Sequence, residues 1–452
     1  MIRRSLVLAL AAALSPMAAQ ATDLLQVYEM ARNGDPQLAS AESTRLYDKE
    51  GQVQARAALL PQLDGTASLT RTKSKYDQPV GTVDSRSRRY SVDGTQTLFN
   101  WSQFSNLRAQ RDISKAADFT LESANDDLIV RTAAAYFNVL VAIESLTAAE
   151  TNEAAAKKQF DYADKRLEVG LAPITDMHEA RAEYDQARAD TITARNTLKD
   201  YYQALTELTG QPVTGLRSLP EDFRPEVPAN YSDIDQLVAT AVSENPALKA
   251  QQLKVSAAES SVSAARGGHY PTLTLGGSWG KTATWGDSTG SGGLTPDHTD
   301  SIGLTLSVPI FSGGATQSAV RQALAQRDIA QDTYEQQKRA LDRNTRNAYQ
   351  TVVAGISEVE ARRLAVVSAQ AAFDASQVGL EVGTRTVLDV VQNQRTLFSA
   401  QVQYAQARYT FLQNRLLLAQ ATGKLDIADL QDINRLLSVD AEAKLQQSSS
   451  SQ

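Results

Sequence analysis

The second half of this 452-residue chain repeats the first. Asp35-Pro36 corresponds to Asn245-Pro246 at an offset of 210 residues. The offset drifts only to 213, where Leu167-Glu168-Val169-Gly170 corresponds to Leu380-Glu381-Val382-Gly383. This period is far longer than the about 20 to 50 residues of a solenoid unit. The chain is therefore predicted to duplicate a whole structural half.

The N-terminal segment predicts export from the cytoplasm. Arg3 and Arg4 precede the apolar stretch 6–14, and Ala19-Gln20-Ala21 fits a cleavage site. The stretch is well short of the roughly 20 residues that span a membrane. Residues 1–21 are therefore expected to form a signal peptide outside the fold.

Composition argues against several function classes. Without the two signal-peptide arginines, 43 Lys and Arg residues face 52 Asp and Glu, a net charge of −9, and no basic cluster predicts nucleic-acid binding. The chain has no cysteine, so we expect no disulfide, no thiol catalysis and no lipidated cysteine. After residue 21 no apolar run is expected to reach transmembrane-helix length, so entry into a membrane would require a closed β-barrel.

Each half begins with a short and a longer helix that a proline separates, because proline suits the first turn of a helix. These helical patterns cover residues 24–33, 36–59, 234–244 and 246–265. The first repeat is expected over 22–230 and the second over 231–425. Residues 426–452 are expected to form an equatorial C-terminal segment with a disordered tail.

An alternating pattern then predicts a β-hairpin in each half, over about 61–100 and about 270–312. Polar segments at 76–88 and 287–300 are expected to be the hairpin loops. In one strand of the second hairpin, apolar residues alternate with small or polar ones: Ile302, Leu304, Leu306, Val308 and Ile310.

The hairpins allow two interpretations. They could pack on a soluble core, or their apolar face could meet lipid while the Thr, Ser and Gly face lines water. In the second case Tyr90, Trp279 and Trp285 are candidates for the membrane interface. Four strands cannot close a barrel, so this interpretation requires several copies of the chain.

A helical pattern of unusual length follows each hairpin. Residues 101–168 and 315–381 contain no proline, and at ~1.5 Å per residue each helix would be on the order of 100 Å long. Each pattern turns at a Val-Gly pair and returns as another helix. Helical hairpins are therefore expected over about 101–209 and 314–422.

The returning helices carry a coiled-coil seam. From Met177 to Leu208 and from Val390 to Ala421, apolar or small residues recur at alternating steps of three and four. An antiparallel coiled-coil rod would explain this seam. It would not explain why each rod is joined to an alternating hairpin.

No motif predicts an enzyme or a cofactor. His178, His269 and His298 share no ligand spacing, so no metal site is expected. A phosphate-binding loop, a nucleophile elbow and a zinc-protease helix are also missing from the sequence.

Two carboxylates occupy equivalent positions, Asp176 and Asp389, each a few residues after a turn. The helix macrodipole stabilises an anion in the first turn of a helix, and Thr175 or Thr386 could cap nearby. This ordinary role is compatible with a second role at the mouth of a channel.

Up to about residue 425 the chain resembles the TolC family of outer-membrane export channels. The resemblance rests on the order of proline-initiated helices, hairpins and long helices, and on two turns, Val169-Gly170-Leu171-Ala172-Pro173-Ile174-Thr175-Asp176 and Val382-Gly383-Thr384-Arg385-Thr386-Val387-Leu388-Asp389. It implies a mixed α and β fold, mainly α, with an internal two-fold repeat. The family architecture is a trimer whose shared twelve-stranded outer-membrane β-barrel continues into a long periplasmic α-helical barrel.

The resemblance implies an exit duct that passively conducts small molecules, polypeptides or both from a tripartite export system. The implied partners are two further copies of the chain, a periplasmic adaptor protein, an inner-membrane ABC or RND-type transporter and outer-membrane lipid. The alternative is a structural or adhesive cell-surface coiled coil. The cargo is not identified by the resemblance.

The resemblance also implies a gate at the periplasmic end. The matching gate positions are Thr175, Asp176, Arg385 and Asp389. The adjoining turns are expected to contact the adaptor through Val169, Gly170, Leu171, Val382, Gly383 and Thr384.

Two residues depart from the family pattern at this gate. Leu380 stands where the family has tyrosine, and Gln392 where it has a second acidic residue. We therefore expect a weaker hydrogen-bonded latch and a weaker attraction for cations. One hypothesis pairs Arg385 with a carboxylate such as Asp176 in the closed state, and a second makes Asp389 a cation-binding ring.

Overall fold

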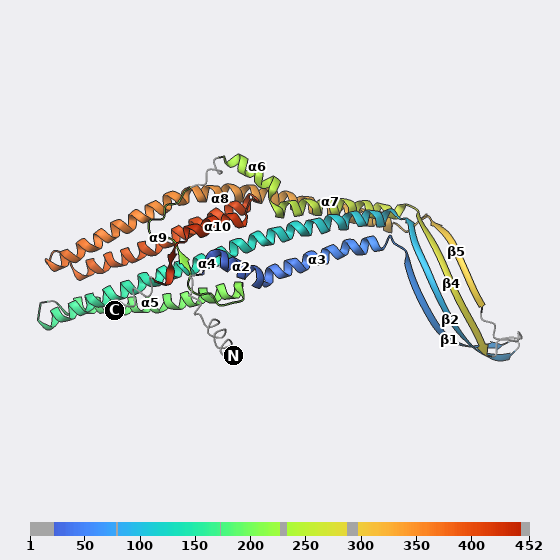
Figure 1. The fold of residues 1–452 in the computed structure, drawn as a ribbon, viewed down its shortest axis with the longest axis horizontal. Helices are drawn as coiled ribbons and strands as arrows, with labels where there is room; N and C mark the ends of the chain where they lie inside the picture. The colour runs from blue at the N-terminus through green and yellow to red at the C-terminus, as the bar shows by residue number, and fades with distance from the viewer. Residues whose placement is uncertain (1–21, 78–79, 172, 227–232, 287–296, 444–452) are drawn as a thin grey trace, which may run out of the picture. The chain divides into compact units, whose positions relative to one another are not determined.

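The computed structural model describes residues 22–77, 80–171, 173–226, 233–286 and 297–443, so the expected signal peptide and the end of the tail lie outside the described residues. Two halves with the same order of elements make up most of the chain (Figure 1). The first half contains α2 (Leu24–Gly34), α3 (Pro36–Ala57), β1 (Gln62–Asp77), β2 (Val80–Phe99), α4 (Trp101–Glu168) and α5 (Ile174–Thr209). The second contains α6 (Ile234–Glu244), α7 (Pro246–Arg266), β4 (Thr272–Gly286), β5 (Asp297–Ser307), α8 (Ala315–Glu381) and α9 (Val387–Ala421).

Short elements connect and follow the halves. A 3-10 helix, η1 (Gly267–His269), leads from α7 into β4. After α9 come α10 (Ile427–Leu436) and β6 (Val439–Asp440), and β6 pairs antiparallel with β3 (Arg217–Ser218). The C-terminal segment is thus tied to the linker that follows the first half.

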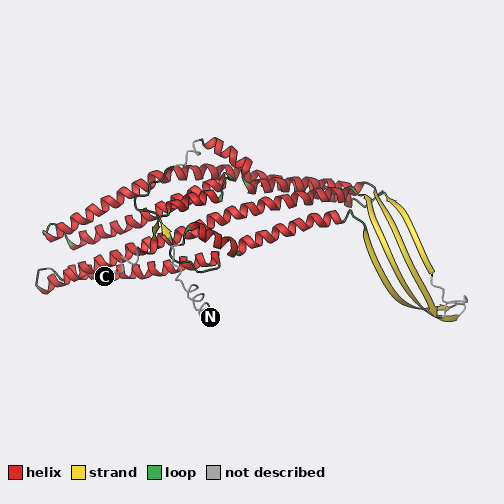
Figure 2. Ribbon diagram, viewed as in Figure 1, coloured by secondary structure: helices red, strands yellow, loops and turns green. Residues whose placement is uncertain are grey.

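The chain forms two compact units. One comprises residues 1–41, 122–246 and 339–452, and the other comprises residues 42–121 and 247–338. The sheet belongs to the second unit, and the far ends of the long helical hairpins belong to the first. Helices and strands are distinguished by colour in Figure 2.

The predicted lengths of the two longest helices are confirmed. α4 has 68 residues and α8 has 67, with the bounds that the sequence predicts. Because neither helix contains proline, its backbone hydrogen bonds continue without a break. Each helix ends next to a glycine with positive φ, Gly170 or Gly383. Within the seam of α5 only Tyr201 is exposed, at 37%, whereas every seam position of α9 is buried or half-buried.

The expectation that no segment is apolar enough to span a membrane as a helix was wrong for α4. Among the described residues this helix alone contains an 18-residue window with a mean hydropathy of 1.4. However, 56% of the window is buried inside the protein, as in the core helix of a soluble domain. Tyr136, Leu140 and Ile143 of α4 are fully buried. Packing within the first unit therefore accounts for the apolar window.

The two predicted hairpins join in one antiparallel sheet with the strand order β1-β2-β4-β5 (Figure 1). The central pair is β2 and β4, so each half contributes one edge strand and one inner strand. β1 and β5 are the edges of this sheet within the described part of the chain.

The sheet has one apolar and one polar face. Residues opposite one another in the register share a face. The exposed apolar residues lie together on one face, which we call the apolar face: Leu63, Leu69, Tyr90, Val92, Leu275, Trp279, Ile302 and Leu304. The other, polar face carries hydroxyl networks, such as Ser91 between Thr66 (2.8 Å) and Asp93 (2.9 Å), and Ser278 with Ser301 (2.7 Å).

Both predicted hairpin loops were too long. β1 and β2 extend to Asp77 and Val80, because polar residues of the expected loop pair across the hairpin and Arg71 donates to Asp84 (Nε to Oδ1, 2.9 Å). In the second hairpin, residues 297–300 belong to β5, while 287–296 lie outside the described residues. β5 also ends at Ser307 instead of Ile310, since Pro309 has no N–H to donate.

Candidate functional site

The turns at the ends of the long helical hairpins share one backbone geometry. In the first turn, the N–H of Leu171 donates to Arg166 (2.8 Å) and that of Gly170 to Leu167 (2.9 Å). In the second, Thr384 donates to Gly379 (2.8 Å) and Gly383 to Leu380 (3.2 Å). This pair of bonds is the Schellman motif, which satisfies the last carbonyls of a helix when glycine adopts a left-handed φ. The duplication therefore extends to the hydrogen bonds of the turns.

The return helix of the first turn begins without a side-chain cap. Its N-cap is Pro173, whose side chain accepts no hydrogen bond. The expectation that Thr175 caps this helix was wrong, because α5 begins at Ile174 and places Thr175 inside the first turn. The Thr175 hydroxyl instead donates to Asp176 Oδ1 at 3.4 Å. Asp176 lies in the first turn, where the helix dipole favours its charge.

The return helix of the second turn has a complete capping box. The Thr386 hydroxyl accepts from the N–H of Asp389 (3.2 Å), and the Asp389 carboxylate accepts from the N–H of Thr386 (2.9 Å). This confirms the expected capping role of Thr386. Hydrogen bonds from the Thr386 backbone and hydroxyl, with the nearby Arg385 charge, hold the pKa of Asp389 below its usual range. The carboxylate is therefore ionised at neutral pH.

Arg385 lies beside this capping box. Its Nη1 is 3.9 Å from Asp389 Oδ1, and both side chains are substantially exposed. A Cβ at Gly379 would lie 2.6 Å from Arg385 Cγ, so glycine leaves the room that the arginine stem occupies. Within the described part of one chain, Arg385 forms no ion pair with Asp176, and the pairing of these two residues in a closed assembly stays a prediction.

An apolar cluster joins all four helices next to the turns. Leu380 is 8% exposed, and the other buried members come from every helix of the two hairpins: Ala163, Ala180, Val387, Val390 and Val391. Phe160 and Phe373 pack against them. The residue that departs from the family pattern thus contributes packing where a tyrosine would bring a hydroxyl.

Two polar contacts between the hairpins were missed by sequence reasoning. Arg395 of α9 donates to the buried Glu183 of α5 (Nε to Oε2, 2.8 Å), and Gln394 donates to Asn152 of α4 (Nε2 to Oδ1, 2.8 Å). All four side chains lie outside the predicted seam. From sequence alone, a polar residue on a helix is predicted to face water unless the partner helix is known. The sequence therefore did not predict these two pairs.

The turns themselves present apolar side chains to solvent. More than half of the residue surface is exposed at each of these positions: Val169, Leu171, Ile174, Val382 and Leu388. Clustered exposed apolar residues of this kind are typical of a surface that another protein covers.

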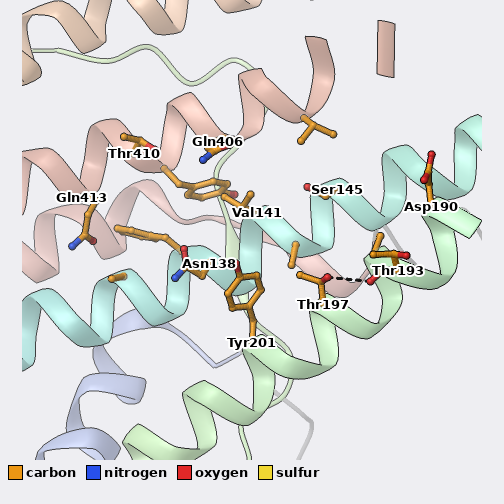
Figure 3. A pocket seen from close by; sticks show the side chains of 16 residues that line it. Asn138, Val141, Ser145, Asp190, Thr193, Thr197, Tyr201, Gln406, Thr410 and Gln413 are labelled. Atoms are coloured by element: carbon orange, nitrogen blue, oxygen red, sulfur yellow. Dashed lines mark hydrogen bonds between the residues drawn. The ribbon is translucent and has the colours of Figure 1, made fainter. Parts of the chain in front are cut away.

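A cavity of about 520 Å³ lies between α4, α5 and α9, away from the turns (Figure 3). Its lining combines aromatic rings with amides and hydroxyls, including Asn138, Tyr201, Gln406 and Gln413 (Figure 3). Asp190 is its one carboxylate, and no histidine, lysine or arginine is among the lining residues. This chemistry offers weak polar contacts rather than an acid-base pair.

The described residues include no group of three or more His, Cys, Asp or Glu side chains placed to hold a metal ion. His178 and His269 are exposed. His298 lies on β5 with its Nε2 3.1 Å from Asp300 Oδ1.

Comparisons with known proteins agree with this geometry. The family model described as outer membrane efflux protein matches residues 27–211 and 237–424, one match in each half. The chain is 34% identical to outer membrane protein TolC of Escherichia coli K12 over 93% of this chain and 86% of that protein. It is 29% identical to the alkaline protease secretion protein AprF of Pseudomonas aeruginosa, over 91% of this chain and 86% of that protein.

A solved structure supports the fold. The Campylobacter jejuni CmeC outer membrane channel matches with a TM-score of 0.76 at 19% identity, over 92% of this chain and 90% of that chain. The chain belongs to the outer membrane efflux protein family of TolC-like channels, and it is an outer-membrane exit duct for efflux or secretion that extends into the periplasm.

Proposed function

We propose that three copies of the chain form one continuous duct. Their sheets together close a twelve-stranded barrel in the outer membrane, and their helical hairpins form a tube across the periplasm. The observation that carries this proposal is the four-stranded sheet. Its exposed apolar face fits lipid, its polar face fits a water-filled lumen, and no other described strand of the chain pairs with its edges.

The edge strands explain why a single chain is insufficient. β1 has 16 residues and β5 has 11, and on the outer side of each strand the backbone groups have no partner strand among the described residues. In lipid each unsatisfied group costs on the order of several kcal/mol, so open sheet edges do not occur there. Pairing of β1 of one copy with β5 of the next removes every open edge.

The duct is passive in this proposal, and an inner-membrane transporter of the ABC or RND type supplies the energy. The turns dock on a periplasmic adaptor through Val169, Leu171 and Val382, with the Schellman glycines Gly170 and Gly383 and the neighbouring Thr384 setting the shape of the contact. The relatives include proteins named for protease secretion and for cobalt-zinc-cadmium resistance. Cargo choice is therefore assigned to the transporter.

The gate in this proposal is the ring of turns. The first half contributes Thr175 and Asp176, and the second contributes Arg385 and Asp389. The repeats 22–230 and 231–425 build the tube, and the segment after residue 425 braces it. The alternative of an adhesive coiled coil is left without support by the family assignment and by the two-faced sheet.

Disulfide crosslinking between edge strands tests the trimer. The chain has no cysteine, so Ser68→Cys on β1 can be combined in turn with Thr299→Cys, Ser301→Cys or Gly303→Cys on β5, all on the polar face. We expect at least one pair to give covalent dimers and trimers in isolated outer membranes. Ser87→Cys on the inner strand β2, in place of Ser68→Cys, serves as the control and should give none. Crosslinking with no pair would contradict the barrel.

A further inference from the structure

Cations gather on one part of the apolar face of the sheet. Toward the connection between β1 and β2, the face changes from leucine and valine to basic residues. We call these residues the cationic band: Arg71, Lys73, Arg86, Arg88 and Lys281. Their position on one face follows from the register, since Leu69 lies opposite Arg88, Arg71 opposite Arg86, and Tyr90 opposite Lys281.

The opposite face lacks this concentration of charge. At the same level the polar face carries serine and threonine, including Thr70, Thr72, Ser85 and Ser87, with Arg89 as its one cation among the described residues. A hairpin that merely projects into water would have no reason to sort its arginines and lysines by face. The sorting indicates that the two faces meet different surroundings at this level.

Most of the cationic band has no carboxylate partner. Arg71 is neutralised by Asp84 through two bonds from Nε, 2.9 Å to Oδ1 and 3.1 Å to Oδ2. Among the described residues, Lys73, Arg86, Arg88 and Lys281 form no ion pair within 4.0 Å, and all four are exposed. Asp84 lies opposite Lys73 and also attracts Lys73 and Arg86, but it is one carboxylate among five cations, so the band keeps an excess of positive charge for an external anion.

The spacing of the band suits phosphate. Residues two apart on a strand are ~6.7 Å apart and neighbouring strands ~4.8 Å apart, so Arg86, Arg88 and Lys281 lie within reach of one headgroup. Arginine binds phosphate through two parallel N–H donors, and lysine binds it as a point charge. Tyr90 and Trp285 share the face with these cations, and aromatic rings of this kind concentrate at the membrane interface.

We propose that the cationic band binds the phosphate groups of anionic lipid headgroups in the outer leaflet around the barrel. The inference rests on the proposed function, since it needs the apolar face to meet lipid and the hairpin ends to reach the outer surface. The apolar face then sets the depth of the barrel, and the cationic band fixes an annular shell of phosphorylated lipid.

Binding of diphosphorylated lipid A to the detergent-solubilised full-length protein, measured by native mass spectrometry, tests the proposal. The variant Arg86→Gln/Arg88→Gln removes two unpaired cations from the band. Arg89→Gln is the matched control, because it removes the same charge from the same strand on the polar face. At roughly fivefold per cation, the double variant should bind on the order of 25-fold more weakly, and the control should bind like the wild type.

A competition experiment distinguishes lipid-bound phosphate from free phosphate, and a second variant covers the case in which the first does not assemble. Inorganic phosphate should not compete at millimolar concentration if a membrane-anchored headgroup is the ligand, and competition would instead indicate a site for free phosphate. If the double variant fails to assemble, Lys73→Gln/Lys281→Gln replaces it. Equal binding by wild type and band variants, or equal loss in Arg89→Gln, would overturn the inference. A conducting trimer that binds no lipid A would leave the proposed function intact, whereas the lack of any trimer would overturn that function.

Discussion

The two turns at the ends of the helical hairpins have the same backbone and different side-chain chemistry. Both use a Schellman motif around a left-handed glycine, Gly170 or Gly383. Only the second adds a capping box, an arginine beside it and a buried leucine at the preceding helix end. The shared part determines where the chain reverses. The side chains unique to the second turn are therefore the better candidates for gating.

A second difference between the halves lies at the joint between the first two helices. In the first half Asp35 is buried and accepts from Arg131 (Nη2 to Oδ2, 2.6 Å) and from the N–H of Leu38 (3.1 Å). At the equivalent joint, the Asn245 side chain donates to the carbonyls of Gln420 and Ala421, each at 3.4 Å, and the Asn245 N–H donates to the carbonyl of Ala241 (3.0 Å). The joint of the first half thus includes an ion pair between Asp35 and Arg131, whereas the second half has an uncharged asparagine at the equivalent position.

The largest expected effect comes from truncating the buried leucine of the second turn. Leu380→Ala should lower the local stability of the α8 and α9 ends by about 3 kcal/mol, because it leaves a cavity in the four-helix cluster. Its equivalent Leu167 is only half-buried, and Leu167→Ala should cost about 1 kcal/mol. Amide hydrogen exchange at both helix ends measures the two values. Equal losses would mean that the turns do not differ in packing.

The next largest effect is expected when Asp35 is replaced by asparagine, the residue at the equivalent position of the second half. Asp35→Asn should destabilise the protein by about 2 kcal/mol, because Arg131 loses its charged partner. Burial alone would raise the pKa of Asp35, but the hydrogen bonds from Arg131, Leu38 and Gln37 outweigh it and hold the pKa below its usual value. Ionised Asp35 therefore stabilises the fold at pH values above its ordinary pKa, and this stabilisation is lost as the pH falls through the lowered pKa of the folded state. Thermal unfolding at pH 7 and pH 3 checks this, and a constant difference between variant and wild type would contradict it.

A buried carboxylate gives the opposite pH dependence. Burial, with the charges of Glu122, Asp127 and Asp426, raises the pKa of Asp126 to about 7. Since the folded state holds the proton more tightly than the unfolded state, stability falls as pH rises from about 4 to 7. Asp126→Asn should match the wild type at pH 4 and exceed it at pH 8 by on the order of 1–2 kcal/mol. Equal unfolding temperatures at pH 8 would show that Asp126 carries no such penalty.

The smallest effect concerns the caps. Thr386→Ala removes the hydroxyl of the capping box and should loosen the first turn of α9 by about 1 kcal/mol. Thr175→Ala is the control, because Thr175 caps nothing and its loss should leave α5 unchanged within a few tenths of a kcal/mol. Hydrogen exchange of the two first turns compares them. A larger loss in α5 than in α9 would reverse the assignment of the cap.

The sequence predicted the helices better than the strands for a physical reason. Glycine follows the last turn of α4 and of α8, at Gly170 and Gly383, so the ends of both helices were predicted from local chemistry alone. β2 includes Asp84, which looks like a loop residue until its pairing with Arg71 across the hairpin is known. A local pattern cannot show which polar residues face a partner strand.

The same limit applies to the candidate site. The turns and the cap at Thr386 could be predicted, because turn and capping chemistry depend on neighbouring residues. The contacts of Glu183 with Arg395 and of Asn152 with Gln394 depend on residues about 210 to 240 positions apart. Likewise, the cationic band appears only once the register of three strands brings its members together.

The central claim is that the repeat builds the duct while the second turn gates it. Single-channel conductance of the purified protein in planar lipid bilayers tests this most directly, with Arg385→Ala compared with Arg166→Ala at the first turn. Arg166 is a fair control, since its guanidinium also lies at a turn, where it donates to the Leu171 carbonyl (3.4 Å). The account predicts a higher conductance for Arg385→Ala and a wild-type conductance for Arg166→Ala. An unchanged conductance in Arg385→Ala, or an increase only in Arg166→Ala, would contradict it.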